Sequence, residues 1–309
     1  MSDIIYTDKD RRDIFKEVRE CIEFNDKLRT KVYIEEELSK IDIVSTDEYF
    51  KYEAVEGDIL DSYYKGIEVD KYKDTLMALD NCMDEYVAIL NFADAYIPGG
   101  PVTDGAEGQE CTLCRSTNLY ESLISDECKD KFYTYNKKLG KASDRIIYTR
   151  NVTYMRDDGC FKTAGFTRQC DVITCAAPKS GEATDDDIRR RMKYIINVAD
   201  ENRVNTLILG CWGCGAAGNS WEHFSELWFS VIKELKPNCK IMFATSGNGT
   251  RLDLIFGKDP FSDKIDPRTE DDVMAYILEK DYNFAGLHDD KAEDDAKYID
   301  AMDRGFMID

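Results

Sequence analysis

The 309-residue sequence is short of several residue types on which whole classes of protein depend. It contains only 6 Pro and 2 His, and its 41 Lys and Arg are outnumbered by 62 Asp and Glu, which gives a net charge of −21. A surface this negative repels phosphate, so we expect no direct nucleic-acid binding through a general positive field. A Ser/His or Cys/His hydrolase would have to use His223 or His288, since these are the only two histidines.

Long apolar runs are also missing. No stretch approaches the roughly 18 apolar residues of a membrane span, and residues 1–13 are charged where a signal peptide needs an apolar segment. We therefore expect a cytoplasmic protein without a membrane span. The 43% hydrophobic content is sufficient for a core in one large domain or two ordinary ones.

Eleven cysteines are present, an odd number in a chain without a secretion signal, which favours reduced thiols over disulfides. Two CxxC pairs stand out, Cys111/Cys114 and Cys211/Cys214. A CxxC pair without a histidine or a second nearby pair is a weak indication of zinc. We expect neither a required metal nor a redox cofactor.

The hydrophobic pattern predicts an α/β protein. Apolar runs typical of strands covered on both faces occur at residues 86–92, 145–155, 171–177, 206–212 and 240–246. Amphipathic patterns predict a peripheral helix over 8–31, a helix over 184–202 capped by Thr184, and a helix from Asn219 or Ser220 to before Pro237. Strands that alternate with helices predict a three-layer α/β/α sandwich.

The C-terminal segment differs in composition from the rest. Residues 258–309 contain 16 Asp and Glu against 7 Lys and Arg, with a short helical pattern near 270–278. We predict an N-terminal helical extension over 1–45, a central domain over 46–257 and an acidic C-terminal extension over 258–309. The extension is either a solvated appendage of the domain or a tail that binds a protein partner.

Two glycine-rich loops follow predicted strands and enter predicted helices. The first passes through Gly99 and Gly100 towards a helix near 107–109, and the second, residues 209–220, contains four glycines. Glycines let a ligand approach the backbone, and the N–H groups at a helix start attract an anion. The first loop alone is equally compatible with a plain turn, but the two together favour a diphosphate held at the carboxyl edge of the sheet. Neither loop is a Walker or a dinucleotide-fold motif.

The motifs in these loops resemble the microbial-type poly(ADP-ribose) glycohydrolases, which are macrodomains. That family's signature is a triple glycine, a spacer of six to eight residues and then Gln-Glu-Glu, after a strand like NFAxAxxPGGG. The matching segments here are Asn91-Phe92-Ala93, Pro98-Gly99-Gly100, Gln109-Glu110, LCRxxxLY at 113–120, VITCAAP at 172–178, LGCWGCGAAGN at 209–219 and Glu56-Gly57-Asp58-Ile59. They follow the family's order from about residue 55 to residue 246. The resemblance implies a macrodomain-like fold with a mixed central sheet over 46–257.

The resemblance also implies a set of ligand contacts. Asp58 would lie near the adenine amino group, and Asp94 would face the distal ribose. Gly99 and Gly100 would contact that ribose and the diphosphate, with Asn91 and Gln109 from the same motifs counted among the substrate-binding residues. The phosphate loop would wrap the diphosphate from the other side with Gly213, Cys214, Gly215, Ala216, Ala217, Gly218 and Asn219.

Three departures from the family pattern bear on activity: Pro101 replaces the third glycine, Ala217 the phosphate-loop aromatic and Cys111 the second glutamate. In the family, that second glutamate is the principal acid/base. General acid/base catalysis contributes roughly 10²–10⁴ in rate to the cleavage of such a glycosidic bond. Glu110 and Cys111 are therefore the candidate catalytic residues.

Three hypotheses follow. In the first, Glu110 acts as the acid/base and the protein hydrolyses O-glycosidic ADP-ribosyl bonds, in polymer or in mono-ADP-ribosylated protein. In the second, the protein binds ADP-ribose or a related NAD-derived nucleotide without turnover. In the third, Cys111 is chemically active, since a thiol at a helix N-terminus is acidified, and it forms a zinc site or disulfide with Cys211. The net charge favours a terminal ADP-ribose unit over a grip along a polymer.

Overall fold

The structure is a computed structural model that describes residues 7–20, 26–41, 67–70, 74–157 and 162–244. The chain divides into two compact units, Met1–Phe261 and Ser262–Asp309, and the second lies outside the described residues. Asp58 and the helical pattern at 270–278 also lie outside them. The domain division after residues 45 and 257 therefore stays a prediction.

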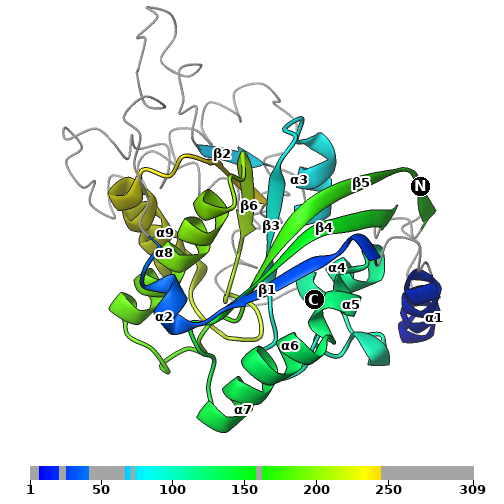
Figure 1. Cartoon of the computed structure of the whole chain (residues 1–309), viewed down its shortest axis with the longest axis horizontal. Coiled ribbons are helices and arrows are strands. Elements are labelled where there is room, and N and C mark those ends of the chain that lie inside the picture. The colour runs from blue at the N-terminus through cyan, green and yellow to red at the C-terminus, as the bar shows by residue number, and fades with distance from the viewer. Residues whose placement is uncertain (1–6, 21–25, 42–66, 71–73, 158–161, 245–309) are drawn as a thin grey trace, which may run out of the picture. The chain divides into compact units, whose positions relative to one another are not determined.

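A mixed sheet of seven strands forms the centre of the described part (Figure 1). The strands are β1 (Arg29–Tyr33), β2 (Ile67–Asp70), β3 (Val87–Phe92), β4 (Ile146–Asp157), β5 (Lys162–Cys175), β6 (Thr206–Gly210) and β7 (Lys240–Ala244). Their spatial order is β1-β4-β5-β3-β6-β7-β2. From β5 to β2 all neighbouring strands are parallel, whereas β4 runs antiparallel to both β1 and β5. The carboxyl ends of β3, β5 and β6 therefore meet at one edge of the sheet.

Helices cover both faces of this sheet. They are α1 (Asp8–Glu20), α2 (Glu35–Leu38), α3 (Thr75–Asn81), α4 (Gln109–Ser116), α5 (Leu119–Leu123), α6 (Asp126–Cys128), α7 (Tyr135–Leu139), α8 (Asp185–Glu201) and α9 (Trp221–Leu235), with a 3-10 turn η2 (Val102–Asp104) and a π-helical segment η3 (Lys129–Thr134). Along β3, Ala88 and Leu90 pack with α8 and α9, while Ile89 packs with α3 and α4 on the other face. This alternation confirms the predicted three-layer α/β/α sandwich.

Helix α8 begins as the sequence predicts. Thr184 is its N-cap, and Thr184 and Asp187 form a capping box. Of the two predicted starts of α9, Asn219 and Ser220, the N-cap is Ser220, whose Oγ accepts the N–H of His223 at 3.3 Å. The side chain of Asn219 is thereby available for the loop that precedes α9.

The predicted helix over residues 8–31 is wrong at its C-terminal end. Helix α1 ends at Glu20, and Arg29–Tyr33 form the edge strand β1, paired with β4. Within β1, Val32 and Tyr33 are buried and Lys31 is exposed, so the charged residues of this segment belong to the solvent side of a strand. Helix α1 packs against α4 and η2.

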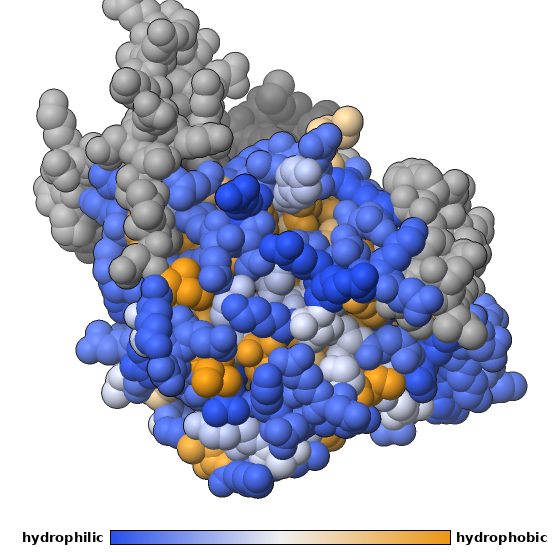
Figure 2. All heavy atoms as spheres, viewed as in Figure 1, coloured by the Kyte–Doolittle hydropathy of each residue, from blue (hydrophilic) through white to orange (hydrophobic). Residues whose placement is uncertain are grey.

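The face shown in Figure 2 is mostly hydrophilic, with small separate apolar patches, as the high charge content leads one to expect. Among the described residues, no helix combines the length and the apolar character that a membrane crossing requires.

The contact between α1 and the loop after η2 yields a stability prediction. Gly105 has φ +82°, and a Cβ there would overlap the carbonyl group of Asp8. Gly140, at the end of α7, has a similar φ of +72° but open space around it. We expect Gly140→Ala to cost about 1–2 kcal/mol from backbone strain alone, and Gly105→Ala to cost at least about 1 kcal/mol more because Asp8 must move. Urea unfolding of both variants measures the difference, and equal costs would contradict the α1 contact.

Candidate active-site cleft

A cleft of about 280 Å³ lies at the carboxyl ends of β3, β5 and β6. One wall is formed by the loop after β3 and the N-terminus of α4, and the other by the loop between β6 and α9. The lining residues are Phe92, Ala93, Asp94, Gly100, Pro101, Glu107, Gly108, Gln109, Glu110, Cys111, Ala177, Cys211, Trp212, Gly213, Gly215, Ala216 and Ala217. The two glycine-rich loops predicted from the sequence therefore face each other.

Glu110, in the first turn of α4, connects the parts of the first wall. Its Oε1 accepts Asn91 Nδ2 at 3.1 Å, and its Oε2 accepts the N–H of Asp94 at 2.8 Å. The N–H of Gly99 is a further backbone donor to the carboxylate. The side chain is only 5% exposed although it lines the cleft.

The surroundings of Glu110 favour its neutral form. Burial raises the pKa of Glu110 to about 8, and the N–H donors from Asp94 and Asn91 oppose this shift without cancelling it. The negative charge of Asp94 adds to the increase. Glu110 is therefore mostly protonated at pH 7, as a general acid must be.

Asn91 and Gln109, predicted to bind substrate, make their hydrogen bonds to the protein. Asn91 is fully buried, does not line the cleft, and donates to Thr174 Oγ1 (3.2 Å) as well as to Glu110. Gln109 lines the cleft, but its Nε2 donates to the carbonyl of Leu90 (2.9 Å) and its Oε1 accepts the N–H of Phe92 (2.9 Å). Both side chains hold α4 against the end of β3.

The two glycines of the first loop have different surroundings. A Cβ at Gly99 would lie 2.8 Å from the ring of Tyr120, so Gly99 packs against the protein behind the cleft. A Cβ at Gly100 would lie 3.4 Å from Glu110 Oε2 and 3.7 Å from Cys111 Sγ. Gly100 therefore leaves open a position that both candidate catalytic side chains approach.

The loop between β6 and α9 presents its backbone to the cleft. Within the described part of the chain, the N–H groups of Gly213, Gly215 and Ala216 have no acceptor, and all three residues line the cleft. Asn219 lies behind them, and its Nδ2 donates to the carbonyls of Gly213 and Pro178, both at 2.9 Å. This arrangement supplies several donors to one anion without a charged side chain.

The predicted ligand contacts thus separate into two groups. Those that line the cleft are Asp94, Gly100, Gln109, Gly213, Gly215, Ala216 and Ala217, and those that do not line it are Asn91, Gly99, Cys214, Gly218 and Asn219. Ala177 and Glu107 also line the cleft, and the sequence did not predict either as a ligand contact. Ala177 lies in the motif at residues 172–178, just after the end of β5, and that position was the signal that could have identified it.

Cysteines surround the cleft without forming a metal site in the described residues. Cys111 and Cys211 both line it as thiols, and Cys111 Sγ lies 3.5 Å from the carbonyl of Gly99. Burial raises the pKa of the Cys214 thiol to about 12. No group of three or more His, Cys, Asp or Glu side chains within the described ranges is arranged to hold a metal ion.

Solved structures share this fold. A poly(ADP-ribose) glycohydrolase from Thermomonospora curvata is 23% identical, with a TM-score of 0.60 over 81% of this chain and 99% of that one. The Deinococcus radiodurans enzyme in complex with ADP-ribose is 22% identical, with a TM-score of 0.60 over 79% of this chain and 96% of that one. The α/β/α sandwich is therefore the fold of these bacterial glycohydrolases.

The sequence comparison is more specific for the first half of the chain. The family described as microbial-type PARG, catalytic domain, matches residues 8–157, which include Gly100, Gln109 and Glu110. No curated protein sequence matches the chain. Residues 8–157 of this chain are therefore similar to the microbial-type PARG catalytic domain, in agreement with the motifs.

The raised pKa of Glu110 predicts a specific pH dependence of stability. A carboxyl whose pKa rises from 4.5 in the unfolded chain to about 8 in the folded one binds its proton more tightly when folded. Its contribution is complete below pH 4.5 and is lost as the pH rises through about 8. The unfolding free energy of the unmodified protein should therefore fall, relative to that of Glu110→Gln, between about pH 5 and pH 8. Urea titrations at both pH values measure this, and a constant difference would contradict the shift.

Proposed function

We propose that this protein binds the terminal ADP-ribose unit of an ADP-ribosylated protein or polymer in this cleft. The observation that carries the proposal is that the N–H groups of Gly213, Gly215 and Ala216 have no acceptor among the described residues, and that these residues line the same cleft as Gly100 and the first turn of α4. Donors on one wall and a helix start on the other suit a diphosphate that enters between them.

The charge of the cleft supports a small ligand over a long polyanion. Its described lining includes the acidic residues Asp94, Glu107 and Glu110 and no Lys, Arg or His. A polymer held along its length needs rows of cationic side chains, whereas a single diphosphate can be held by backbone N–H groups. The shared fold adds support, because the Deinococcus radiodurans relative was solved in complex with ADP-ribose.

Binding can be tested by calorimetry with ADP-ribose and a variant of the phosphate loop. Gly213 has φ +81°, and a Cβ there would lie 2.9 Å from Ala177 Cβ and from the Phe224 ring. We expect Gly213→Ala to displace the N–H groups and to weaken ADP-ribose binding by at least about tenfold.

Gly140→Ala is the matched control, because it imposes similar backbone strain away from the cleft. Its affinity for ADP-ribose should equal that of the unmodified protein. Absence of binding by the unmodified protein at millimolar ADP-ribose, or equal losses in the two variants, would refute the proposal.

A second candidate function is hydrolysis of the O-glycosidic bond, and the neutral state of Glu110 favours it. A carboxyl with a pKa of about 8 can protonate the leaving oxygen at neutral pH and then accept a proton from the attacking water. In this hypothesis Glu110 replaces the carboxylate that the family carries at the position of Cys111.

Release of free ADP-ribose from mono- and poly-ADP-ribosylated substrates tests hydrolysis. We expect Glu110→Gln to reduce release by at least about 100-fold, and the rate of the unmodified protein to fall above about pH 8, where Glu110 loses its proton. Glu121→Gln is the control, because Glu121 pairs with Arg19 on α1 and does not line the cleft. Binding without release above a buffer control would leave the protein a reader of ADP-ribose, and release gained in Cys111→Glu would then identify residue 111 as the missing group.

A further inference from the structure

The segment that separates the cleft from a second cavity holds the phosphate loop in place. This segment, residues 176–183, is called the partition here. Ala177 lines the cleft, whereas Pro178, Glu182 and Ala183 line a cavity of about 180 Å³ on the other side. Because a cavity lies behind the partition, close packing alone does not fix its position. The hydrogen bonds of the partition must therefore fix its position.

Towards the cleft, the partition and the end of β5 bind the phosphate loop at three points. The N–H of Ser180 donates to the carbonyl of Ala217 at 2.8 Å, and Asn219 Nδ2 donates to the carbonyl of Pro178 at 2.9 Å. Trp212 Nε1 donates to the carbonyl of Cys175 at 2.9 Å. A shift of the partition would therefore move the N–H groups proposed to bind the diphosphate.

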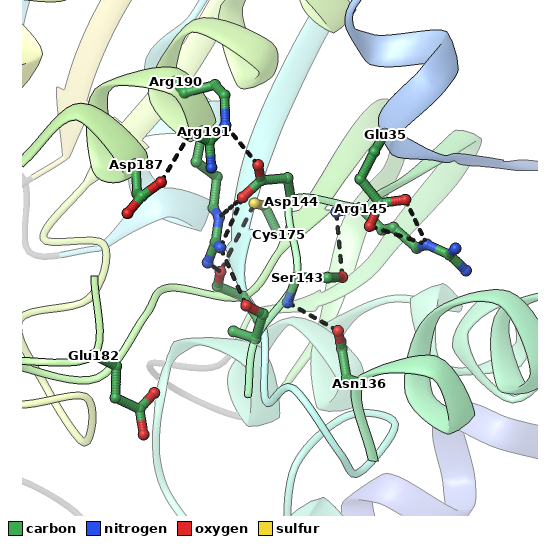
Figure 3. A network of polar contacts seen from close by, with 12 residues as sticks. Glu35, Asn136, Ser143, Asp144, Arg145, Cys175, Glu182, Asp187, Arg190 and Arg191 are labelled. Atoms are coloured by element: carbon green, nitrogen blue, oxygen red, sulfur yellow. Dashed lines mark hydrogen bonds and ion pairs between the residues drawn. The ribbon is translucent and has the colours of Figure 1, made fainter. Parts of the chain in front are cut away.

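Behind the partition, Arg191 of α8 makes the anchoring contact (Figure 3). Its Nη1 donates to the carbonyl of Ala176 at 2.8 Å, and its Nη2 donates to the carbonyl of Ala142 at 3.1 Å. Arg191 is only 4% exposed. One buried guanidinium thus joins α8, the loop before β4 and the first residue of the partition.

Asp144 fixes the orientation of Arg191. Its Oδ1 accepts Nε and Nη2 of Arg191 at 3.1 and 2.8 Å, and its Oδ2 accepts Nε of Arg190 at 2.8 Å. Figure 3 shows both arginines converging on this carboxylate from α8. The paired contacts hold the guanidinium plane so that Nη1 points at the partition.

We propose that Arg191, oriented by Asp144, is a positioning residue for diphosphate recognition. It acts through the carbonyl of Ala176 and the partition on the N–H groups of the phosphate loop, and it does not touch the ligand. This inference rests on the proposed function, since it names what holds that binding site in shape.

The test compares two ligands that differ in the diphosphate. ADP-ribose and adenosine are titrated into the unmodified protein, Arg191→Met and Arg191→Lys. We expect Arg191→Met to weaken ADP-ribose binding by at least about tenfold while adenosine binding changes less than about twofold. Arg191→Lys should be intermediate, because a lysine keeps the charge beside Asp144 but cannot make all the bonds of a guanidinium.

Arg145→Lys is the matched control. Arg145 also lies in this network and pairs with Glu35 at 3.0 Å, but it has no contact with the partition among the described residues (Figure 3). It should leave both affinities unchanged. Equal losses of ADP-ribose and adenosine binding in Arg191→Met, or the same effect in Arg145→Lys, would overturn the proposal and indicate a general structural role.

Amide hydrogen exchange separates this inference from the proposed function and does not require a ligand. The N–H of Ser180 and the N–H of Asn219, which donates to Gly213, should lose protection in Arg191→Lys and keep it in Arg145→Lys. Unchanged protection would overturn the positioning role even if ADP-ribose binds. Lost protection in a protein that fails to bind ADP-ribose would refute the proposed ligand and leave the positioning of the loop intact.

Discussion

The hydrogen bonds that end on the buried Glu110 carboxyl hold the first wall of the cleft together. They join Asn91 at the end of β3 and the N–H of Asp94 in the following loop to the first turn of α4. The burial that these contacts require also keeps the carboxyl protonated near neutral pH. The burial and hydrogen bonding of Glu110 therefore shape the loop around Gly100 and also keep the one carboxyl in the first turn of α4 in its neutral form. A carboxyl exposed to solvent would neither hold the loop nor stay protonated at neutral pH.

The second wall shows how a protein of net charge −21 could hold the proposed diphosphate. Its donors are backbone N–H groups. The shape of the loop that carries them depends on the positive φ angles of Gly213 and Gly218 and on the hydrogen bond from the Asn219 side chain to the carbonyl of Pro178. Such donors are short-ranged, so they do not attract a polyanion from a distance as a basic groove does. Recognition then depends on the shape of the loop, which is why the partition behind it matters.

The sequence predicted the interior of the fold better than its edges. Strands β3 and β6 are buried along almost their whole length and mostly apolar, so the hydrophobic pattern predicts them. The pattern at strand β1 instead predicts the end of a helix, since an edge strand with exposed Arg29 and Lys31 has the charged composition of a helix surface. In the cleft, the motifs pointed to Gly100 and Glu110, and the structure places both residues in the lining. The spacing of motifs could not show that the Asn91 side chain is buried and does not line the cleft, because spacing does not give the direction of a side chain.

The buried position of Arg191 also does not follow from motif spacing, but the sequence contains a feature that indicates it. It is the last of three consecutive arginines, Arg189 to Arg191, which read as a solvated helix face. Yet Arg191 lies three residues after Ile188 and four before Ile195, which places it on the buried stripe of α8. A buried arginine needs a fixed set of acceptors, and here two of them are the carbonyls of Ala176, in the partition, and of Ala142, in the loop before β4. The position of an arginine on the apolar stripe of α8 was therefore the sequence feature that indicated the buried contacts of Arg191.

Cys111, which the resemblance places where the family carries a glutamate, follows directly after Glu110, on which the hydrogen bonds of the first wall end. The bonds from Asn91 and from the N–H of Asp94 end on Glu110, and Cys111 Sγ lies 3.5 Å from the carbonyl of Gly99. Both side chains lie near Gly100, where a Cβ would be 3.4 Å from Glu110 Oε2 and 3.7 Å from Cys111 Sγ. Under the proposed function, binding of ADP-ribose depends on both walls of the cleft whereas turnover depends on a catalytic carboxyl, so a variant can lose one and keep the other.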